Sequence, residues 1–454
     1  MRDDTRIAGD LHPMLGIALA LSCLVGCSDA GDSTDSPPAP LNIVLFVLDA
    51  ARADHFGVYG YERATTPSID AFAADAARFT HAIAEGSFTF ASMSSLFSGL
   101  SPDRTGLLKA RRLGDDLHLL PEVAREAGYR TRGYSENPYI TPAFGFDRGF
   151  DDFDAVLAYQ DFKRDTRNFE HTDASAGIEA MLDFMSEPSE RPFFAYLHLL
   201  RPHNPYAPSA DFAGRFGSHD GQRQGNTQRL LALDKRKRPP APKQVDNLRA
   251  LYDENLAEGD AMFGALFEGL ASRGLLEDTL VIVLSDHGEA FLEHGRLLHG
   301  STTFDEMIRI PLLIRIPGVS GSVVDHPVQL AGVGATLQQV LQGSQPPVAL
   351  VRAGANDTGE TLSWAMQHER RACLRNREHK LIVDTASLEV VGYYDLRADP
   401  LETTSLPLDE EGSRLLARIE TRIRSGHASL AKPPASALEP KVLERLRALG
   451  YAEE

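Results

Sequence analysis

Residues 41–49 read LNIVLFVLD, an apolar run of the length of a strand that ends in a carboxylate. Such a run is typical of a strand that is buried on both faces of a parallel sheet. Three further runs share this character: 193–199, 279–284 and 311–316. Helical patterns lie between the runs, at 68–77, 119–127 and 247–273. This alternation predicts an α/β fold with one large, mostly parallel sheet, and ligand sites in such sheets lie beyond the carboxyl ends of the strands.

The composition fits one large α/β domain with a smaller appendage. Of the 454 residues, 43% are hydrophobic and 24% are charged, which excludes a wholly disordered protein. The formal net charge of -18 disfavours nucleic acid as a partner, because an acidic surface repels phosphate backbones. One basic run, KRKR at 235–238, precedes two prolines and is interpreted as a solvated loop. An anionic substrate is still compatible with the charge, because a bound metal inverts the field inside one pocket.

The first 40 residues predict export and a lipid anchor. An apolar stretch from about 14 to 25 is too short to span a bilayer and is typical of a signal-peptide core. It runs into LVGC at 24–27, which resembles the bacterial lipobox, whose cysteine is lipidated and becomes the mature N-terminus. We therefore expect a signal peptide at 1–26, a lipidated Cys27, a flexible tether at 27–40, and a place on the periplasmic or surface side of the bacterial cell envelope. An ordinary signal peptide with a chance cysteine is the alternative.

The rest of the chain divides at about residue 318. We expect a larger domain at 41–318 and a smaller C-terminal α+β subdomain at 319–454. In the larger domain, the polar segment 211–245 is weakly periodic and predicts an insertion or long loop at one edge of the site. The expected elements of the subdomain are short antiparallel strands at 380–383 and 388–394 and a helix at 410–423.

The strongest local signal is SDHGE at 285–289, directly after an apolar run. A carboxylate and an imidazole side by side at a strand end can both reach one divalent cation, because the chain leaves the extended conformation there. Asp49 ends the first run in the same way, although by itself it is equally suited to capping a helix. Asp49, Asp286 and His287 form an incomplete oxygen and nitrogen set that suits Zn, Mn, Ca or Mg. A nucleophile, water or substrate must supply the remaining ligands.

Hydroxyl residues crowd the segment SFTFASMSSLFSG at 87–99. They lie at the start of an expected helix, where unpaired backbone N–H groups and the helix dipole favour an anion or an alkoxide. The Ser and Thr side chains can equally serve only to cap that helix. Periodicity does not separate these two interpretations.

Four segments, in their order along the chain, resemble the successive motifs of the sulfatase family, a branch of the alkaline-phosphatase superfamily. They are NIVLFVLDAARADHFGVYG at 42–60, TFASMSSLFSG at 89–99, SDHGEAFLEHGRLLHG at 285–300 and RIPLLIRIP at 309–317. YDL at 394–396 and DPLE at 399–402 are similar to the C-terminal signature of that family. The resemblance covers the chain from about residue 41 to its end. It implies a sulfatase-type α/β sandwich with a catalytic domain at 41–318.

The resemblance also implies roles for individual residues. Four of them match the family's set around one divalent cation: Asp49, Thr89, Asp286 and His287. Thr89 stands where the family places its nucleophile. His203 matches a histidine that the family uses near the leaving group, and His299 matches a position that contacts the transferred group.

Three departures from the family pattern bear on the activity. Sulfatases of the family carry a Cys or Ser that is oxidised to formylglycine at the position of Thr89. Ala91 and Met93 replace the Pro and Arg of the nucleophile motif, and Ala50 replaces the second of two acidic residues after the first strand. We therefore expect a metal-dependent hydrolase or transferase for phosphate or sulfate esters, with phospho-esters favoured, as in threonine-dependent phospho-ester enzymes.

Two alternatives stay open. One is a sulfuric ester hydrolase that works without formylglycine, and the other is a non-catalytic envelope lipoprotein that keeps the fold as a binding module. The complete set of Asp49, Asp286 and His287 favours an enzyme. Its expected partners are an anionic ester (a small molecule, a glycan or a lipid headgroup) and the membrane, which the protein contacts through Cys27.

Overall fold

The computed structural model describes residues 40–156, 174–217, 225–235, 238–352, 359–365 and 369–430. The predicted signal peptide, the lipidation site Cys27 and the tether up to residue 39 lie outside these residues. The strands of the main sheet are β1 (Asn42–Asp49), β2 (Ala77–Phe79), β4 (Arg130–Ser135), β5 (Asp152–Ala155), β6 (Phe193–Pro202), β7 (Thr279–Ser285), β11 (Leu312–Arg315) and β12 (Ser322–Val324). Their order across the sheet is β12-β2-β11-β7-β1-β6-β4-β5.

The centre of the sheet is parallel, and one side of it is mixed. β1 lies between β6 and β7 and is parallel to both, and β4 is parallel to β6 and β5. β11 is antiparallel to both β7 and β2. The apolar runs at 41–48, 193–199 and 279–284 are confirmed as the three central strands. The run at 311–316 also contains a strand, but that strand runs against the parallel direction.

Residues of β1 point alternately into two hydrophobic cores, as the twofold repeat of a strand requires. Leu45 and Val47 lie in the core on one face, and Val44, Phe46 and Leu48 lie in the core on the other. All five side chains are completely buried. A strand with no polar face can fold only where helices cover both sides of the sheet.

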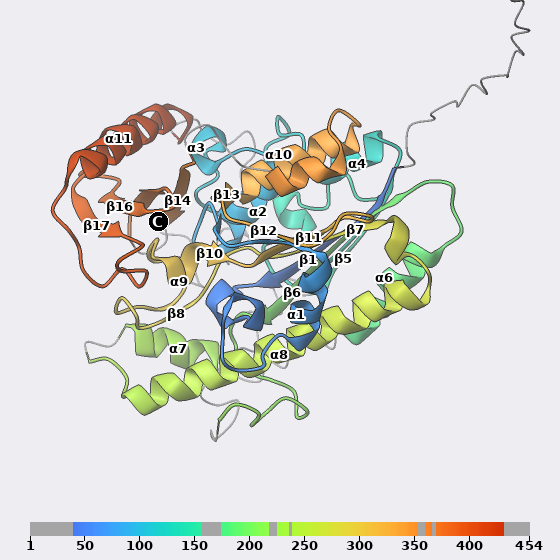
Figure 1. The fold of residues 1–454 in the computed structure, drawn as a ribbon, viewed down its shortest axis with the longest axis horizontal. Helices are drawn as coiled ribbons and strands as arrows, with labels where there is room; N and C mark the ends of the chain where they lie inside the picture. Colours follow the sequence, from blue (N-terminus) through green and yellow to red (C-terminus); the bar gives the residue numbers. More distant parts are fainter. Residues whose placement is uncertain are drawn as a thin grey trace, which may run out of the picture. The chain divides into compact units, whose positions relative to one another are not determined.

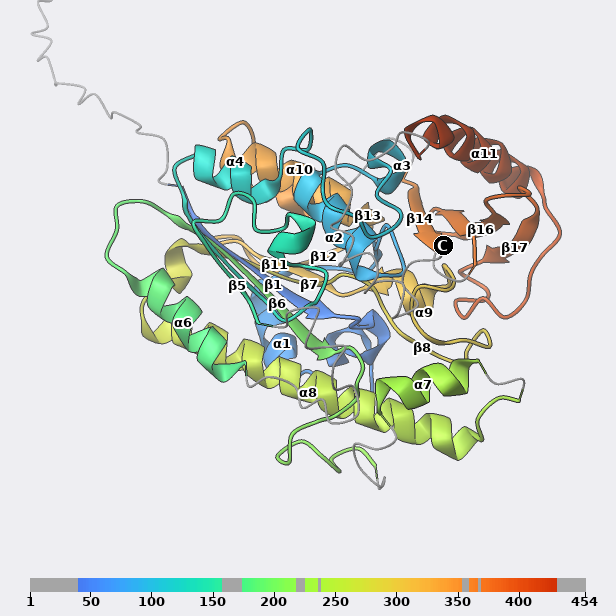
Figure 2. The same cartoon turned by 180° about the vertical axis from the view of Figure 1, so that it is seen from behind.

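Two helical layers provide this cover (Figures 1 and 2). The helices on one face are α2 (Thr89–Ser98), α4 (Leu120–Glu126) and α10 (Leu330–Leu341), whose apolar residues share one core. The helices on the opposite face are α1 (Pro67–Phe72), α6 (Ser175–Ser186) and the long α8 (Pro242–Ser272). Further short helices are α3 (Pro102–Thr105), α7 (Thr227–Asp234) and α9 (Asp305–Ile308).

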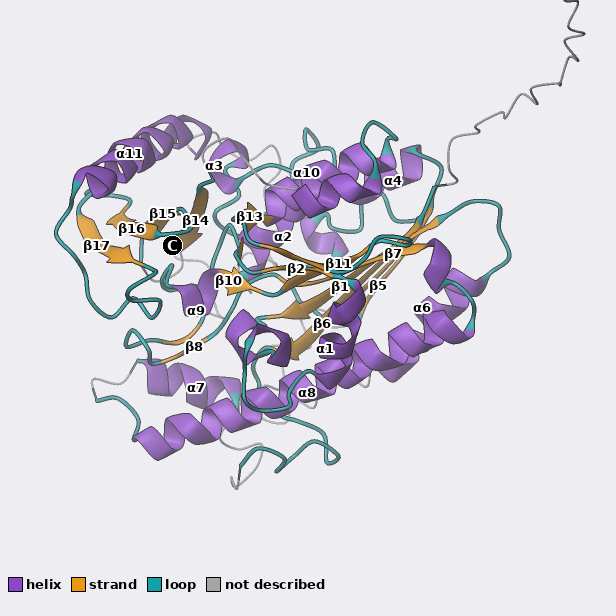
Figure 3. Ribbon diagram, in the orientation of Figure 1, coloured by secondary structure: helices purple, strands orange, loops and turns teal. Residues whose placement is uncertain are grey.

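A second, antiparallel sheet follows in the C-terminal part (Figure 3). Its strands, in spatial order, are β14 (Thr361–Ala365), β15 (Arg371–Arg375), β16 (His379–Asp384) and β17 (Val390–Asp395). Helix α11 (Glu410–Leu430) packs on it through Leu415, Ile419 and Ile423. Buried Lys380 of β16 lies 2.9 Å from Asp305 of α9 and 2.7 Å from Glu402, so a charged contact connects the second sheet with α9.

Small two-residue strands complete the fold around the end of the main sheet. β3 (Ala82–Ile83), β10 (Arg309–Ile310) and β13 (Val328–Gln329) form a three-stranded sheet. β8 (Ala290–Phe291) and β9 (Leu297–Leu298) form a hairpin just after β7. Among the described helices, none combines the length and the apolar character that crossing a membrane would require.

The structure corrects three expectations. The smaller sheet begins near Thr361 rather than at residue 319, because β12 pairs with β2 in the main sheet and α10 packs on α2. The segment 211–245 is not a continuous loop, since α7 lies within it and α8 begins at Pro242; residues 218–224 and 236–237 are outside the described part. The helix expected at 68–77 is α1, which ends at Phe72 and passes into a 3-10 turn at Ala73–Asp75 before strand β2 starts at Ala77.

Candidate active site

The main sheet brings three separate segments together at the carboxyl ends of its central strands. Asp49 is the last residue of β1, and Asp286 and His287 directly follow β7. Leu48 pairs with Ser285, so both strands end at the same level of the sheet. The candidate ligand atoms of Asp49, Asp286 and His287 lie within 4.8 Å of one another, and all three residues are buried.

Each of the two carboxylates has one oxygen held by protein donors and one oxygen left over. Asp286 Oδ1 accepts the backbone N–H groups of Ala50 and His287, each at 2.9 Å, and its Oδ2 has no hydrogen-bond partner. Asp49 Oδ2 accepts a hydrogen bond from Asn137 Nδ2, and its Oδ1 has no partner. A buried carboxylate oxygen without a donor is unfavourable unless a cation is close to it.

His287 presents one ring nitrogen to the same space. Its Nδ1 donates to the carbonyl oxygen of Gly288 at 2.8 Å, which leaves Nε2 as the ligand atom. Nε2 lies 3.3 Å from Asp286 Oδ2 and 3.7 Å from Asp49 Oδ1. Gly288 is required here, because a Cβ on it would lie 2.2 Å from the carbonyl oxygen of Glu306.

Thr89 is the first residue of α2, and its hydroxyl faces these atoms. Thr89 Oγ1 lies 3.3 Å from His287 Nε2 and accepts a hydrogen bond from Asn137 Nδ2 at 3.2 Å. The Thr89 side chain points into the site from the amino end of the helix, where the helix dipole favours negative charge. The hydroxyl therefore lies beside the candidate metal ligands.

The electrostatics of the pair of aspartates favour a cation. Burial, together with the charge of Asp286, raises the pKa of Asp49 to about 7. Burial opposes ionisation of Asp286 as well, but the nearby His287 and His198 and the N–H of Ala50 lower the pKa of this carboxyl. Two carboxylates in a dry site repel each other, and a divalent cation or a proton relieves that repulsion.

The residues present fit one divalent cation. Two partnerless carboxylate oxygens, one imidazole nitrogen and one hydroxyl converge, and this mixed oxygen and nitrogen set is compatible with Zn, Mn, Ca or Mg. The expected metal centre is therefore supported by the geometry, and the identity of the metal is left open by the ligand types.

The two further predicted site residues lie beside this cluster. The ring centroids of His299 and His287 are 4.4 Å apart, and those of His299 and His203 are 4.8 Å apart. His203 Nδ1 donates to the carbonyl oxygen of Asn204, and burial lowers the pKa of His203. The structure thus places all six predicted site residues of the folded part in one region.

Sequence reasoning missed a carboxylate that holds His299. Glu289 Oε1 lies 3.0 Å from His299 Nδ1, and Glu289 Oε2 accepts the hydroxyl hydrogen of Tyr206 at 2.9 Å. Burial raises the pKa of Glu289 to about 7. The signal was present, because Glu289 stands in the SDHGE segment two residues after His287.

Two more residues in the site went unnoticed in the sequence. Asn137 follows β4, and its Oδ1 accepts the N–H of Tyr139 at 2.7 Å, which turns Nδ2 toward Asp49 and Thr89. The strand before it reads RTRGYS and is not apolar, so the sequence pattern did not indicate a strand end near Asn137. His198 is a polar interruption in the apolar run of β6 and is completely buried. A histidine in such a run is a usable signal.

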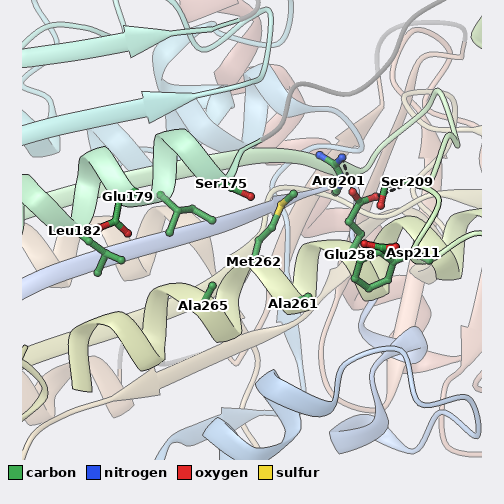
Figure 4. Close-up of a pocket in the computed structure, with 12 residues that line it drawn as sticks. Ser175, Glu179, Leu182, Arg201, Ser209, Asp211, Glu258, Ala261, Met262 and Ala265 are labelled. Carbon is green, nitrogen blue, oxygen red and sulfur yellow. Dashed lines mark hydrogen bonds and ion pairs between the residues drawn. The ribbon is translucent and has the colours of Figure 1, made fainter. Parts of the chain in front are cut away.

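A cavity in the described part of the chain is a different feature. It has a volume of about 670 Å³ and lies between α6 and α8, with Arg201, Ser209, Asp211 and Glu258 at one end (Figure 4). Arg201 is already paired with Glu258 at 2.9 Å. None of the predicted site residues lines this cavity, and its carboxylates outnumber its single guanidinium. An anionic ester therefore fits the strand ends better.

Comparisons with known proteins agree with this arrangement. A family model described as Sulfatase matches residues 41–343. The chain is 26% identical to the ulvan-active sulfatase of Formosa agariphila over 341 residues, 69% of this chain and 64% of that protein. It is 25% identical to arylsulfatase K of Canis lupus familiaris over 358 residues, 68% of this chain and 65% of that protein. The matched regions span slightly less than two thirds of these relatives.

Solved structures show the same fold. The phosphonate monoester hydrolase of Agrobacterium radiobacter superposes with a TM-score of 0.66 at 19% identity, covering 88% of this chain and 98% of that chain. A protein solved with its substrate D-glucosamine-2-N,6-O-disulfate gives a TM-score of 0.66 at 18% identity, covering 87% and 100%. At this identity the likeness concerns the fold alone. It confirms the predicted fold class, a large α/β sheet with a smaller C-terminal antiparallel sheet.

Proposed function

Because the chain belongs to the sulfatase family, a family of ester hydrolases, we propose that it is a metal-dependent hydrolase or transferase of phosphate or sulfate esters that prefers phospho-esters. One observation carries the proposal. The Thr89 hydroxyl converges with His287 Nε2 and with the two carboxylate oxygens that have no partner, those of Asp49 and Asp286.

In this proposal Thr89 is the nucleophile. Asp49, Thr89, Asp286 and His287 would hold a divalent metal, which would supply Lewis-acid stabilisation of the charge that develops on the transferred group. Asn137 Nδ2 holds Thr89 Oγ1 in place and is close enough to donate to negative charge that develops beside the nucleophile. Thr89, at the start of α2, thus attacks from a fixed position.

The two histidines complete the reaction. His203 Nδ1 donates to the Asn204 carbonyl, so Nε2 of the protonated ring is the atom that delivers a proton to the leaving oxygen. Glu289 holds the Nδ1 side of His299, which orients the opposite side of that ring toward the transferred group. In this proposal His203 acts on the leaving group and His299 on the transferred group.

The side chain at position 89 argues for phosphorus over sulfur. Formylglycine hydrate expels sulfate because its second hydroxyl collapses the intermediate to an aldehyde. Threonine has one oxygen on its β-carbon, so a sulfated Thr89 lacks that exit. A phosphorylated Thr89 is open to attack at phosphorus by water, which gives hydrolysis, or by an acceptor alcohol, which gives transfer.

The second candidate is a sulfatase that uses an unmodified threonine. It is favoured by the family itself and by relatives with sulfatase names, one active on ulvan. Both candidates share an anionic ester substrate, for which a small molecule, a glycan and a lipid headgroup are the classes. Both also accommodate the proposed lipid anchor at Cys27 and a place on the cell envelope.

A substrate panel separates these candidates. Purified protein is assayed with aryl sulfates, phosphomonoesters, phosphodiesters and phosphonate esters, with and without added divalent metal, and Thr89→Ala is the control. We expect phosphate or phosphonate ester turnover that depends on Thr89. Efficient turnover of an aryl sulfate with negligible phosphodiesterase activity decides for the sulfatase, and absence of any Thr89-dependent turnover rejects both.

A further inference from the structure

His198 is a buried histidine that the reaction described above does not use. It lies in β6, and its side chain is completely inaccessible to solvent. Its Nδ1 lies 2.8 Å from the hydroxyl of Tyr196, and its Nε2 lies 3.5 Å from Asp49 Oδ2. Nε2 has no hydrogen-bond partner, so this ring points an unused nitrogen at a carboxylate.

The sheet explains why these side chains meet. Tyr196 and His198 are two residues apart in β6 and therefore point to the same face of the sheet. His198 pairs with Val47 of β1, and the register shifts between Leu48 and Asp49, so that Asp49 pairs with Pro202. Asp49 is two residues beyond Val47, so the alternation of the strand places its side chain on the same face as His198.

The chemistry of the contacts selects one form of the ring. If Nδ1 carried the hydrogen, the Nε2 lone pair would face the Asp49 carboxylate and repel it. With the hydrogen on Nε2, the Tyr196 hydroxyl donates to Nδ1 and Nε2–H points at Asp49 Oδ2. At 3.5 Å this is a charge–dipole contact, longer than an ordinary hydrogen bond.

We propose that Tyr196 and His198 form a positioning pair that fixes the Asp49 carboxylate, with Oδ2 held by the protein and Oδ1 presented to the divalent cation. The inference rests on the proposed function in one respect, that Asp49 is a metal ligand. It adds a pair of residues and the order in which they act. Tyr196 fixes the hydrogen position of His198, and His198 fixes the Asp49 carboxylate. Neither residue touches the nucleophile, in contrast to Asn137, which contacts both Asp49 and Thr89.

The pair explains the unequal surroundings of the two oxygens of Asp49. Oδ2 faces two donors, Asn137 Nδ2 and His198 Nε2, whereas Oδ1 faces none. A carboxylate held in this way keeps a ligand oxygen aimed at the cation and loses less rotational freedom when the cation binds. Partners of this kind behind a metal ligand typically contribute 10- to 100-fold to metal affinity.

Metal affinity is the first test, measured by competition with a chelator for Zn²⁺ and Mn²⁺. We expect His198→Phe, which fills the space without a donor, to bind more weakly by about 10- to 100-fold. His198→Gln, whose amide can place an N–H near the same point, should lose less than about tenfold. Tyr196→Phe should fall between the parent and His198→Phe, and the double variant should be no weaker than His198→Phe alone, because Tyr196 acts through His198.

The second test measures the parent protein and uses a variant only to assign one signal. Nitrogen-15 spectra of histidine-labelled parent protein report which ring nitrogen of His198 carries the hydrogen, and His198→Gln identifies the signal. We expect the hydrogen on Nε2 and not on Nδ1. Two results overturn the proposal. One is a hydrogen on Nδ1, and the other is an unchanged metal affinity in folded Tyr196→Phe and His198→Phe. If the parent itself binds no metal, the proposed function fails instead, so the two failures are distinguishable.

Discussion

Thr89 Oγ1 lies 3.3 Å from His287 Nε2, although the two residues are 198 positions apart in the chain. Thr89 is the first residue of α2, and His287 lies in the turn after β7. The contact places a hydroxyl beside the cluster in which Asp49 and Asp286 each have a carboxylate oxygen without a hydrogen-bond partner. The proposed nucleophile and the candidate metal centre therefore lie in one site.

Loss of the Thr89 hydroxyl should abolish most of the activity. We expect Thr89→Ala to lower kcat by at least the roughly hundred- to thousandfold that one strong transition-state contact supplies. Thr89→Ser should retain part of the activity, because the hydroxyl survives without the methyl group. Ser95→Ala is the matched control, since its hydroxyl on the same helix bonds only to the Ala91 carbonyl. Equal activity of the parent and Thr89→Ala contradicts the assignment.

Asp286→Asn should empty the metal site. Asp286 Oδ1 is held by two backbone N–H groups, so an asparagine there must turn its NH₂ toward the cation. We expect bound metal, measured by elemental analysis, to fall well below one ion per chain, and His287→Ala should do the same. Asp260→Asn is the control, because Asp260 is a buried carboxylate whose oxygens accept the N–H groups of Ser68 and Ile69. Full metal content in Asp286→Asn and His287→Ala rejects the site.

The role of His203 predicts a dependence on the leaving group. His203→Gln should slow esters of poor leaving groups, such as alkyl alcohols, by roughly hundredfold or more, the range of general-acid catalysis. Esters of para-nitrophenol should be affected much less, because that leaving group departs without a proton. Half-exposed His118, which pairs with Glu126, provides the control His118→Gln. Losses of equal size for both kinds of ester would falsify the leaving-group role.

We expect Glu85, which is not one of the candidate metal ligands, to make the stability of the protein depend on pH. Its Oε1 accepts the N–H of Ala331 at 2.6 Å, its Oε2 has no partner, and burial raises its pKa to about 8. A pKa raised above the unfolded value means that the folded state keeps a proton that the unfolded state releases. The stability from this group is therefore complete below about pH 4.5 and is lost as the pH rises to about 8.

Glu85→Gln should remove this pH dependence. Relative to the parent, the free energy of unfolding of the variant should rise between about pH 5 and about pH 8, at about 1.4 kcal/mol for each pKa unit at most. Urea unfolding at the two pH values measures it, and Glu126→Gln at an exposed site on α4 is the control. A difference between Glu85→Gln and the parent that does not change with pH contradicts the prediction.

The proposed lipid anchor is tested in cells. Cys27 follows a lipobox-like segment, so Cys27→Ala should leave the membrane fraction of a bacterial host while the parent stays in it. Labelled palmitate should be incorporated into the parent and not into the variant. Should both proteins remain in the membrane fraction, the lipobox interpretation is wrong.

Much of the fold could be predicted because buried parallel strands form continuous apolar runs in the sequence. The runs around Phe46, Leu197 and Ile282 are apolar apart from His198, since both of their faces lie in a core. The antiparallel direction of β11 could not be predicted in this way. Its apolar pattern is the same in either direction, and the chain path between β7 and β11 decides the pairing.

The sequence by itself determined the central α/β sheet, and it predicted one site made of Asp49, Thr89, Asp286 and His287. Both predictions were possible because strand ends and the order of motifs can be read directly along the chain. Only the tertiary structure decided which oxygen of each aspartate is left without a donor. It also added Asn137, His198 and Glu289, whose places follow from the pairing of β4, β6 and β7 with their neighbours. A hydrogen-bond partner supplied by a neighbouring strand depends on register, and register is a property of the assembled sheet.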